Sequence, residues 1–392
     1  MGRYACNVLG LVRGSEKSNF LKEGVIEDMN ILLPSIALQV TYQCNIECKH
    51  CGPCCGPNEK DWMTLNEMKY LVRQATEMGA ANVIFTGGEP TLLGDDLIEI
   101  LRFCHQETGV KSTRMVSNGK WATSYKNAHN LLKKWQDAGL VEINISCGEF
   151  HQQYVPMQNV VNAYHAACDL NYPTVLLGGE FLKEGAGQYT IQDFQQATGA
   201  DLFVPESRSP YVSKNHGILR GSAMRYGRGA QYIRPDDVNT TEGDAFAGNC
   251  SQVFAALTAL PTGHITACCG VMTRDESFLT VGNWREQPLL SIWKAAQEDL
   301  IMNWIKYLGL GDMKAWLLEK DPELSLRTRF TSACDLCAEM IYNPRCQELL
   351  LNNGKERTGD ILVNRLAIEA AGLQRQAMNG STREQELAIT CD

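Results

Sequence analysis

Three cysteines lie within the eight residues Cys44-Asn-Ile-Glu-Cys48-Lys-His-Cys51. Three thiolates can bind three irons of a cubane iron–sulfur cluster and leave the fourth iron open to another ligand. A structural zinc knot is the alternative, but such a site normally takes four protein ligands. The spacing therefore favours an iron–sulfur cluster with one open iron.

Strand and helix patterns alternate around this cysteine loop. The apolar run 36–42 precedes the loop directly, and Thr64-Leu-Asn-Glu67 is a capping box that predicts a helix ending at Gly79. Alternation of this kind predicts a parallel sheet with crossover helices. The sequence thus predicts an α/β fold, built as a partial (β/α)6 TIM-like barrel. Further helices are expected at 95–107, 124–138 and 159–170, and further strands at 82–86, 112–117, 141–146, 174–177 and 201–204.

Unusual motifs follow four of these strands. The cysteine loop follows the first, Gly87-Gly88-Glu89-Pro90 the second, Ser117-Asn118-Gly119 the third and residues 146–151 the fourth. In barrels of this type the C-terminal ends of the strands carry the chemistry. Residues without a Cβ atom let the backbone approach a ligand closely, and a carboxylate accepts hydrogen bonds from an ammonium group. We therefore expect one site at this rim.

The cysteine spacing, with Gly-Gly-Glu one βα unit later, resembles the signature of the radical S-adenosylmethionine (radical SAM) enzymes. In that family the open iron of a [4Fe–4S] cluster chelates the amino and carboxylate groups of SAM, and one electron cleaves SAM to a 5′-deoxyadenosyl radical. The resemblance implies that Cys44, Cys48 and Cys51 bind this cluster. It further implies SAM contacts for His50 near the adenine, for Gly87, Gly88 and Glu89 at the methionyl amino group, and for Ser117 and Asn118.

Two basic residues near the rim have open roles. His151 titrates near neutrality, so it could act as a general acid or base, or it could shape the substrate pocket, which we favour. Arg228 lies in Arg225-Tyr-Gly-Arg-Gly-Ala, which resembles a Gly-Arg stretch common after the sixth strand of radical SAM enzymes. Its guanidinium could face the SAM carboxylate, face the substrate, or pair at the surface.

A second set of cysteines follows residue 235, where the α/β alternation stops. Leu260-Pro-Thr-Gly263 is typical of a hairpin whose turn needs glycine. The cysteine and glycine spacing here resembles the twitch and SPASM domains that are appended to radical SAM enzymes. This resemblance implies one auxiliary [4Fe–4S] cluster, with a zinc ribbon as the alternative because spacing alone does not separate the metals. The implied ligands are Cys250, Cys268, Cys334 and Cys337.

Cys269 neighbours one of these expected ligands. Adjacent residues of a strand point to opposite faces, so its thiol is expected to face the active-site cavity. Together with the other motifs it resembles the radical SAM peptide epimerases, in which the second cysteine of such a pair donates a hydrogen atom to the substrate radical. Cys269 is therefore our candidate catalytic residue, with Cys147 as a rival donor. Whether Cys54, Cys55 or Cys346 bind a cluster is left open.

Composition bounds the class of protein. The chain has 392 residues with a net charge of −9, and its sixteen cysteines gather mainly in three clusters. Dense cysteine clusters in a cytosolic chain indicate metal ligands or reactive thiols. The acidic balance disfavours a nucleic-acid partner, no apolar run approaches the ~20 residues of a membrane span, and the start lacks a secretory signal. We expect a cytoplasmic, oxygen-sensitive protein that does not bind a membrane.

The predicted domains are an N-terminal extension at 1–34, a radical SAM barrel at 35–235, a twitch/SPASM-like domain at 236–350, and a C-terminal helix and tail at 351–392. Only 43 residues precede the first cysteine of the loop, fewer than a separate peptide-recognition domain needs. That shortage weakens the hypothesis of a peptide substrate without removing it.

The leading hypothesis is a radical SAM enzyme that epimerises residues of a ribosomally made peptide, with Cys269 as the hydrogen donor. A peptide cross-linking (macrocyclising) enzyme and a sugar or aminocyclitol dehydrogenase or epimerase fit the same cysteines. An iron–sulfur electron carrier is the alternative outside enzymes, and Gly87-Gly88-Glu89 counts against it. The expected partners are a precursor peptide or small-molecule substrate and a flavodoxin- or ferredoxin-type reductant.

Overall fold

The computed structural model describes residues 33–203, 215–268, 270–271, 274 and 277–371. Three sequence predictions concern residues outside these ranges: most of the N-terminal extension, the end of the C-terminal tail, and the candidate hydrogen donor Cys269. No helix in the described ranges is long and apolar enough to cross a membrane.

Six strands run parallel in sequence order, each one hydrogen-bonded to the next along the chain. A helix lies in each connection between them. The predicted α/β fold with a mostly parallel sheet is therefore confirmed. The strands are β1 Ser35–Gln39, β2 Asn82–Thr86, β3 Ser112–Ser117, β4 Glu142–Gly148, β5 Thr174–Phe181 and β6 Asn215–Ser222. The helices are α1 Leu65–Glu77, α2 Asp95–Glu107, α3 Tyr125–Asp137, α4 Met157–Asp169 and α5 Ile191–Thr198.

The predicted capping box opens α1 as expected. The Thr64 side chain accepts a hydrogen bond from the Glu67 backbone N–H at 3.3 Å, and the Glu67 carboxylate accepts one from the Thr64 backbone N–H at 2.8 Å. Two N–H groups that have no partner inside the helix are thereby satisfied. Local sequence alone fixes this boundary, which ends the long loop carrying the cysteines.

The predicted sixth strand at 201–204 is wrong. The sixth strand is β6, and Leu202 forms only an isolated bridge to Ile218. The Leu202 side chain is 53% exposed, whereas Ile218 is fully buried in the core and pairs with Leu177 of β5. The burial of Ile218, which no local pattern reveals, therefore decides which segment joins the sheet.

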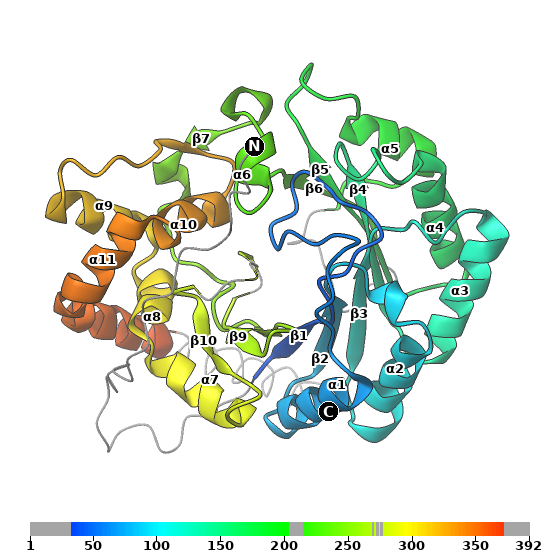
Figure 1. Cartoon of the computed structure of the whole chain (residues 1–392), viewed down its shortest axis with the longest axis horizontal. Helices are drawn as coiled ribbons and strands as arrows, with labels where there is room; N and C mark the ends of the chain where they lie inside the picture. Colours follow the sequence, from blue (N-terminus) through cyan, green and yellow to red (C-terminus); the bar gives the residue numbers. More distant parts are fainter. Residues whose placement is uncertain (1–32, 204–214, 269, 272–273, 275–276, 372–392) are drawn as a thin grey trace, which may run out of the picture.

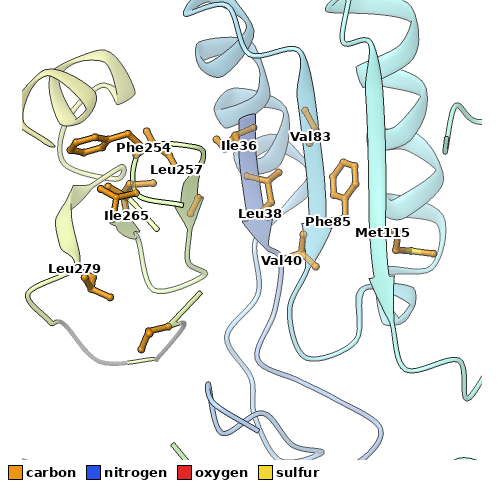
Figure 2. Packing of buried hydrophobic residues seen from close by; sticks show 14 of the residues in the cluster. Ile36, Leu38, Val40, Val83, Phe85, Met115, Phe254, Leu257, Ile265 and Leu279 are labelled. Carbon is orange, nitrogen blue, oxygen red and sulfur yellow. The ribbon is translucent and has the colours of Figure 1, made fainter. Parts of the chain in front are cut away.

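One face of the strands packs against helices α1–α5. Val83 and Phe85 of β2 are fully buried, whereas the alternate residues Asn82, Ile84 and Thr86 are partly exposed on the other face. Burying one such apolar side chain stabilises the fold by about 1.5–3 kcal/mol. Figure 2 shows these side chains with others of the same core, among them Ile36, Leu38, Val40, Met115, Leu257 and Ile265.

The C-terminal part extends the same sheet past β1. Strand β8 (Leu257–Ala259) pairs in parallel with β1, and β9 (His264–Thr266) and β10 (Thr280–Asn283) continue antiparallel. The full order is β10-β9-β8-β1-β2-β3-β4-β5-β6. The predicted hairpin is present, and Gly263 in its turn has φ +101°, where an added Cβ atom would lie 2.4 Å from Asn283 Oδ1.

The helices that follow β10 lie beside the C-terminal strands in Figure 1, and the first of them packs against α1. The first helix after β10 is α7, and residues 358–371 are helical, within the predicted C-terminal helix and tail at 351–392. The division at residue 235 and the twitch/SPASM-like assignment of 236–350 stay predictions. The helices are α6 Gly229–Tyr232, α7 Leu289–Glu298, α8 Leu300–Tyr307, α9 Leu310–Lys320, α10 Ala333–Ile341 and α11 Pro344–Asn353. Two short strands, β7 Thr241–Glu242 and β11 Arg329–Phe330, form a separate pair.

Candidate active site

The first cysteine group, Cys44, Cys48 and Cys51, lies on the loop after β1. Cys44 and Cys48 are each 6% exposed in one small apolar cluster with Tyr42 and Ile46, and Cys51 packs against that cluster. The loop returns to its own start, because the Cys44 N–H donates to the Gly56 carbonyl at 3.0 Å and the Gly56 N–H donates to the Tyr42 carbonyl at 3.2 Å. The three predicted ligands are thus brought together.

The three thiols differ in acidity. Burial raises the pKa of Cys44 to about 11 and also raises the pKa of Cys48. A hydrogen bond from the Cys55 side chain lowers the pKa of Cys51 to about 6, with His50 and Arg228 contributing in the same direction. Since cluster ligands are thiolates, metal loading has to release the protons of Cys44 and Cys48.

Arg228 clamps the cysteine loop. Its Nη1 donates to the Cys48 carbonyl at 2.7 Å, its Nη2 donates to the Cys55 carbonyl at 2.6 Å, and its backbone N–H donates to the Cys51 carbonyl at 3.1 Å. Of the three roles that the sequence left open, the structure records an ion pair, with the exposed Glu47 at 3.8 Å, while the hydrogen bonds of the guanidinium go to the loop backbone. Its positive charge also lies close to thiols that must become anionic.

Glu89 joins the predicted SAM-contacting residues to one another. The carboxylate is fully buried and accepts hydrogen bonds from Ser117 Oγ at 2.8 Å, the Asn118 N–H at 2.8 Å and Thr91 Oγ1 at 2.7 Å. Burial raises the pKa of Glu89 against the effect of these donors. Asn118 Nδ2 in turn lies 3.6 Å from Cys44 Sγ. Residues of β2, β3 and the cysteine loop therefore meet at one place on the rim.

Gly87 and Gly88, which precede Glu89, are required by close packing against the backbone of residues 41–43. An added Cβ atom on Gly88 would lie 2.0 Å from the Gln43 carbonyl oxygen, and one on Gly87, at φ +151°, would lie 2.7 Å from the Thr41 carbonyl oxygen. The Gly88 and Glu89 N–H groups donate to those two carbonyls, Thr41 and Gln43 respectively. We expected the glycines to admit a ligand. In the structure they admit the backbone that leads into the cysteine loop.

A second Gly-Gly-Glu, at residues 178–180, ends β5, and the sequence analysis did not single it out. Glu180 Oε2 lies 2.8 Å from His50 Nε2. Burial lowers the pKa of His50, but the Glu180 carboxylate outweighs burial and raises it. Burial raises the pKa of Glu180, and the His50 charge outweighs burial and lowers it. Because Gly-Gly-Glu also follows β2, the repeat at the end of another predicted strand was the signal that could have identified Glu180.

His50 and His151 lie together beside this ion pair. His50 stacks on Phe150 with ring centroids 4.8 Å apart, and His151 meets His50 edge-on at 4.9 Å. Burial and the nearby His50 charge lower the pKa of His151 to about 3, which keeps that imidazole neutral. The Nδ1 atoms of both rings are buried and make no hydrogen bond to the described residues. Buried polar atoms of this kind normally have a partner, so they fit a site that takes a polar ligand.

The second cysteine group, Cys250, Cys268, Cys334 and Cys337, comes from three separate segments. Burial, followed by the thiols of Cys268, Cys334 and Cys250, raises the pKa of Cys337, so all four predicted ligands lie near one another. The Gly270 N–H donates to Cys268 Sγ at 3.2 Å. An added Cβ atom on Gly270 would lie 2.7 Å from Cys334 Sγ.

Asp335 fixes the start of α10, which carries Cys334 and Cys337. The carboxylate is fully buried, pairs with Arg327 at 2.9 Å, and accepts from the Thr331 N–H at 3.0 Å. The sequence analysis missed this residue, although it stands between the two cysteines. Its ion pair holds the helix end that presents both thiols.

The donor sets of the two groups are thiols only, which suits iron–sulfur clusters or zinc. In the described ranges, no three His, Cys, Asp or Glu side chains converge closely enough to hold a single metal ion. A cubane does not need that convergence, because each thiolate binds a different iron. The residues present therefore fit the cluster type that the spacing predicts.

The remaining cysteines fall outside the two groups. Cys55 is 3% exposed, and its N–H donates to Cys51 Sγ at 3.3 Å. Cys147, the rival hydrogen donor, is fully buried in the same core as Ile143 and Ile145 of β4. Cys346 is fully buried on α11, with Glu339 and Asp321 as its charged neighbours. The arrangement disfavours Cys147 as a donor, and Cys269 lies outside the described residues.

Comparison with known proteins gives a family for the N-terminal part. Residues 38–174 match the family model of the Radical SAM superfamily. Curated relatives include the GTP 3′,8-cyclase of Actinobacillus pleuropneumoniae serotype 7, 26% identical over 171 residues, which are 41% of this chain and 47% of that protein. The GTP 3′,8-cyclase of Pasteurella multocida is 32% identical over 114 residues, 28% of this chain and 32% of that protein. The chain thus spans about half the length, or less, of the curated relatives it matches.

Two solved structures resemble the chain at low identity. BtrN in complex with AdoMet and 2-DOIA is 15% identical, covers 73% of this chain and 91% of its own, and gives a TM-score of 0.43. Native anSMEcpe with bound AdoMet and Cp18Cys peptide is 13% identical, covers 84% of this chain and 100% of its own, and gives a TM-score of 0.45. The curated relatives named above are GTP 3′,8-cyclases, so they do not support the resemblance to peptide epimerases.

Proposed function

From the premise that residues 38–174 form a radical SAM superfamily domain, we propose that the chain is an enzyme that cleaves SAM and abstracts hydrogen from a substrate. The first cysteine group would hold the [4Fe–4S] cluster that binds SAM. When bound, that cluster and SAM supply a 5′-deoxyadenosyl radical, and the protein contributes binding, orientation and electrostatics. One observation carries the proposal: Glu89, Ser117 and Asn118 meet within hydrogen-bond distance beside Cys44.

The protein side of SAM binding is assigned as follows. Glu89 anchors the rim, because its buried carboxylate already accepts hydrogen bonds from Ser117 and Asn118. The methionyl end of SAM would meet this anchored rim, formed by Gly87, Gly88, Glu89, Ser117 and Asn118. His50, stacked on Phe150, would lie at the adenine, where its Nδ1, which has no hydrogen-bond partner among the described residues, offers a polar contact.

The second cysteine group would hold an auxiliary [4Fe–4S] cluster that decides what happens to the substrate radical. If Cys269 returns a hydrogen atom, the carbon is inverted, and the resulting thiyl regains one electron and one proton. If instead one electron passes to the auxiliary cluster and one proton leaves the substrate, the product is dehydrogenated or cross-linked. We propose peptide epimerisation as the first alternative and dehydrogenation or cross-linking as the second. The proximity of the four thiols supports the auxiliary cluster that both alternatives use.

The SAM site is tested by electron paramagnetic resonance (EPR) spectroscopy of the anaerobically reconstituted, reduced protein. Addition of SAM is expected to change the signal of the first cluster in the wild type and in Cys334→Ala. An iron-loaded protein whose signal ignores SAM would contradict the proposal and favour an iron–sulfur electron carrier. The reductant in the cell would be a flavodoxin- or ferredoxin-type protein.

The fate of the radical is tested by co-expression in deuterated water with short open reading frames adjacent to the gene, followed by mass spectrometry of the peptides. Gain of one deuterium per modified residue, with D-residues on hydrolysis, is the expected result of epimerisation. Loss of two hydrogens would support cross-linking or desaturation. Unchanged peptides would move the proposal to a small carbohydrate-like substrate.

A further inference from the structure

Residues Tyr226-Gly227-Arg228 connect the two cysteine groups, and we call them the strap. They follow β6 and precede α6. On one side the strap touches the loop of the first cysteine group, and on the other it touches the chain between ligands of the second group. From the sequence, a role could be suggested for Arg228 but not for Tyr226.

The strap is seated against the first cysteine loop. Gly227 has φ +56°, and an added Cβ atom there would lie 2.0 Å from the Gly52 carbonyl oxygen. An added Cβ atom on Gly52 would lie 2.4 Å from the Tyr226 ring. Glycine is thus required on both sides of the contact, since any side chain would push the two backbones apart. Arg228 adds to this contact through its hydrogen bonds to the Cys48 and Cys55 carbonyls.

The hydroxyl of Tyr226 reaches the second cysteine group. It donates to the Gly270 carbonyl at 3.1 Å, and the Gly270 N–H donates to Cys268 Sγ at 3.2 Å. Gly270 is also the residue on which an added Cβ atom would lie 2.7 Å from Cys334 Sγ. The hydroxyl therefore fixes a residue that bonds one expected ligand and touches another.

Tyr226 suits this place by size and by chemistry. Its side chain is buried, at 9% exposure, and burial raises its pKa, so the phenol stays protonated and remains a donor. A buried tyrosine hydroxyl needs a hydrogen-bond partner, and the Gly270 carbonyl supplies it. Phenylalanine would fill the same space without holding Gly270, so the hydroxyl is the part that links the two groups.

We propose that Tyr226 is a positioning residue that holds the second cysteine group in register with the first, and this inference rests on the auxiliary cluster of the proposed function. The ring seats on Gly52 of the first loop, and the hydroxyl orients Gly270 so that its N–H meets Cys268 Sγ. Hydrogen bonds to cluster sulfurs raise the reduction potential, because they stabilise the more negative, reduced state. Tyr226 thereby sets the potential of the second cluster as well as its position.

The test is a redox titration monitored by EPR on the anaerobically reconstituted full chain, which reads each cluster independently of turnover. The second cluster is isolated in the background Cys44→Ala/Cys48→Ala/Cys51→Ala. In that background Tyr226→Phe is expected to keep the iron and lower the midpoint potential of the second cluster. In the opposite background, Cys334→Ala/Cys337→Ala, Tyr226→Phe is expected to leave the first cluster unchanged, whereas Tyr226→Leu is expected to alter its EPR signal because the packing on Gly52 is lost.

Tyr125→Phe is the matched control, since the Tyr125 hydroxyl bonds Asp169 on the helical layer and should move neither potential. If the iron-loaded triple-cysteine variant has the same midpoint potential of the second cluster with Tyr226 as with Phe at that position, the inference about Tyr226 is overturned and the proposed function still stands. A triple-cysteine variant that binds no iron would overturn the auxiliary site of the proposed function and this inference with it. If Tyr226→Leu fails to fold, Tyr226→Phe decides the question by itself.

Discussion

The two cysteine groups are built in opposite ways. The first comes from one loop between β1 and α1, and a clamp of hydrogen bonds from Arg228 to loop carbonyls holds it. The second collects Cys250, Cys268 and the pair on α10, and the buried Asp335–Arg327 ion pair fixes the end of that helix. A local loop would suit the proposed SAM-binding cluster, in which one iron stays open to another ligand. Ligands gathered from distant segments suit a site that is closed by its own protein.

The largest expected effect separates the two groups directly. Cys44→Ala removes one of three predicted ligands and is expected to reduce SAM cleavage to the background level, because two thiolates leave the cluster one ligand short. Cys334→Ala should retain SAM cleavage while losing about half of the bound iron and the ability to complete turnover. Iron analysis and quantification of 5′-deoxyadenosine check both. Cys346→Ala, a buried cysteine outside both groups, is the control that should keep iron and activity.

The second largest expected effect follows from loss of the Glu89 carboxylate beside the first cysteine group. Glu89→Ala leaves the Ser117 hydroxyl and the Asn118 N–H without their acceptor, which costs about 3–5 kcal/mol for several unsatisfied buried groups. Urea unfolding of the metal-free protein measures that loss, and titration of the loaded protein should show weaker SAM binding. Glu142→Gln is the matched control, since Glu142 is a buried carboxylate that pairs with Arg114 at the other end of β4. Equal loss of SAM binding in both variants would argue against a rim role for Glu89.

The third effect concerns the clamp. Arg228→Lys keeps the charge but cannot donate to the Cys48 and Cys55 carbonyls at once, so about 1.5–3 kcal/mol of loop stabilisation should be lost. The EPR signal of the first cluster is expected to broaden while that of the second is unchanged. Arg234→Lys, at an exposed arginine paired with Asp237, should alter neither signal. A change in the second cluster alone would contradict the assignment of the clamp.

The smallest effect is a pH dependence of the free energy of unfolding of the metal-free protein. It arises from the ion pair between His50 of the first cysteine loop and Glu180 of β5. Because the pKa of His50 is raised in the folded protein, the charged imidazole stabilises the fold fully below about pH 6.5, the pKa of histidine in the unfolded chain. This stabilisation is lost as the pH rises through the folded-state pKa of His50. The lowered pKa of Glu180 means that its contribution is complete above about pH 4.3 and is lost as the pH falls through the folded pKa. The pair thus stabilises most between these limits.

Glu180→Gln tests this pair, because it removes the carboxylate charge and keeps the shape. The free energy of unfolding is expected to fall by about 1–2 kcal/mol between pH 4.5 and 6.5, a modest value because the Glu180 side chain is 30% exposed. The difference from wild type should shrink above that range. Glu149→Gln is the comparison variant, since Glu149 accepts from backbone N–H groups and has no histidine partner in the described contacts. A difference that stays constant with pH would show that the ion pair does not control it.

Local patterns predicted much of this architecture. The cysteine loop, the Gly-Gly-Glu after β2, the capping box of α1 and the hairpin turn at Gly263 depend on neighbours in sequence, so they could be found without the fold. The strand at 201–204 was wrong because the choice between Leu202 and Ile218 depends on burial against the rest of the sheet.

Tyr226 and Glu180, which were missed, and Arg228, whose partners were not predicted, act across long separations. Tyr226 bonds Gly270, Arg228 bonds Cys48, and Glu180 pairs with His50. Each contact exists because parallel strands bring their C-terminal ends to one rim, and no residue pattern near 226 or 228 marks its partner. Sequence could therefore predict which cysteines gather in the two groups but not the strap that joins them, and the clusters that these groups would hold stay predictions.

The most direct test of the account is to incubate the reduced, iron-loaded wild-type protein with SAM and measure 5′-deoxyadenosine by liquid chromatography and mass spectrometry. We expect 5′-deoxyadenosine and methionine in equal amounts, formed only with reductant and abolished in Cys44→Ala. Protein that carries its clusters, takes up electrons and forms no 5′-deoxyadenosine would contradict it.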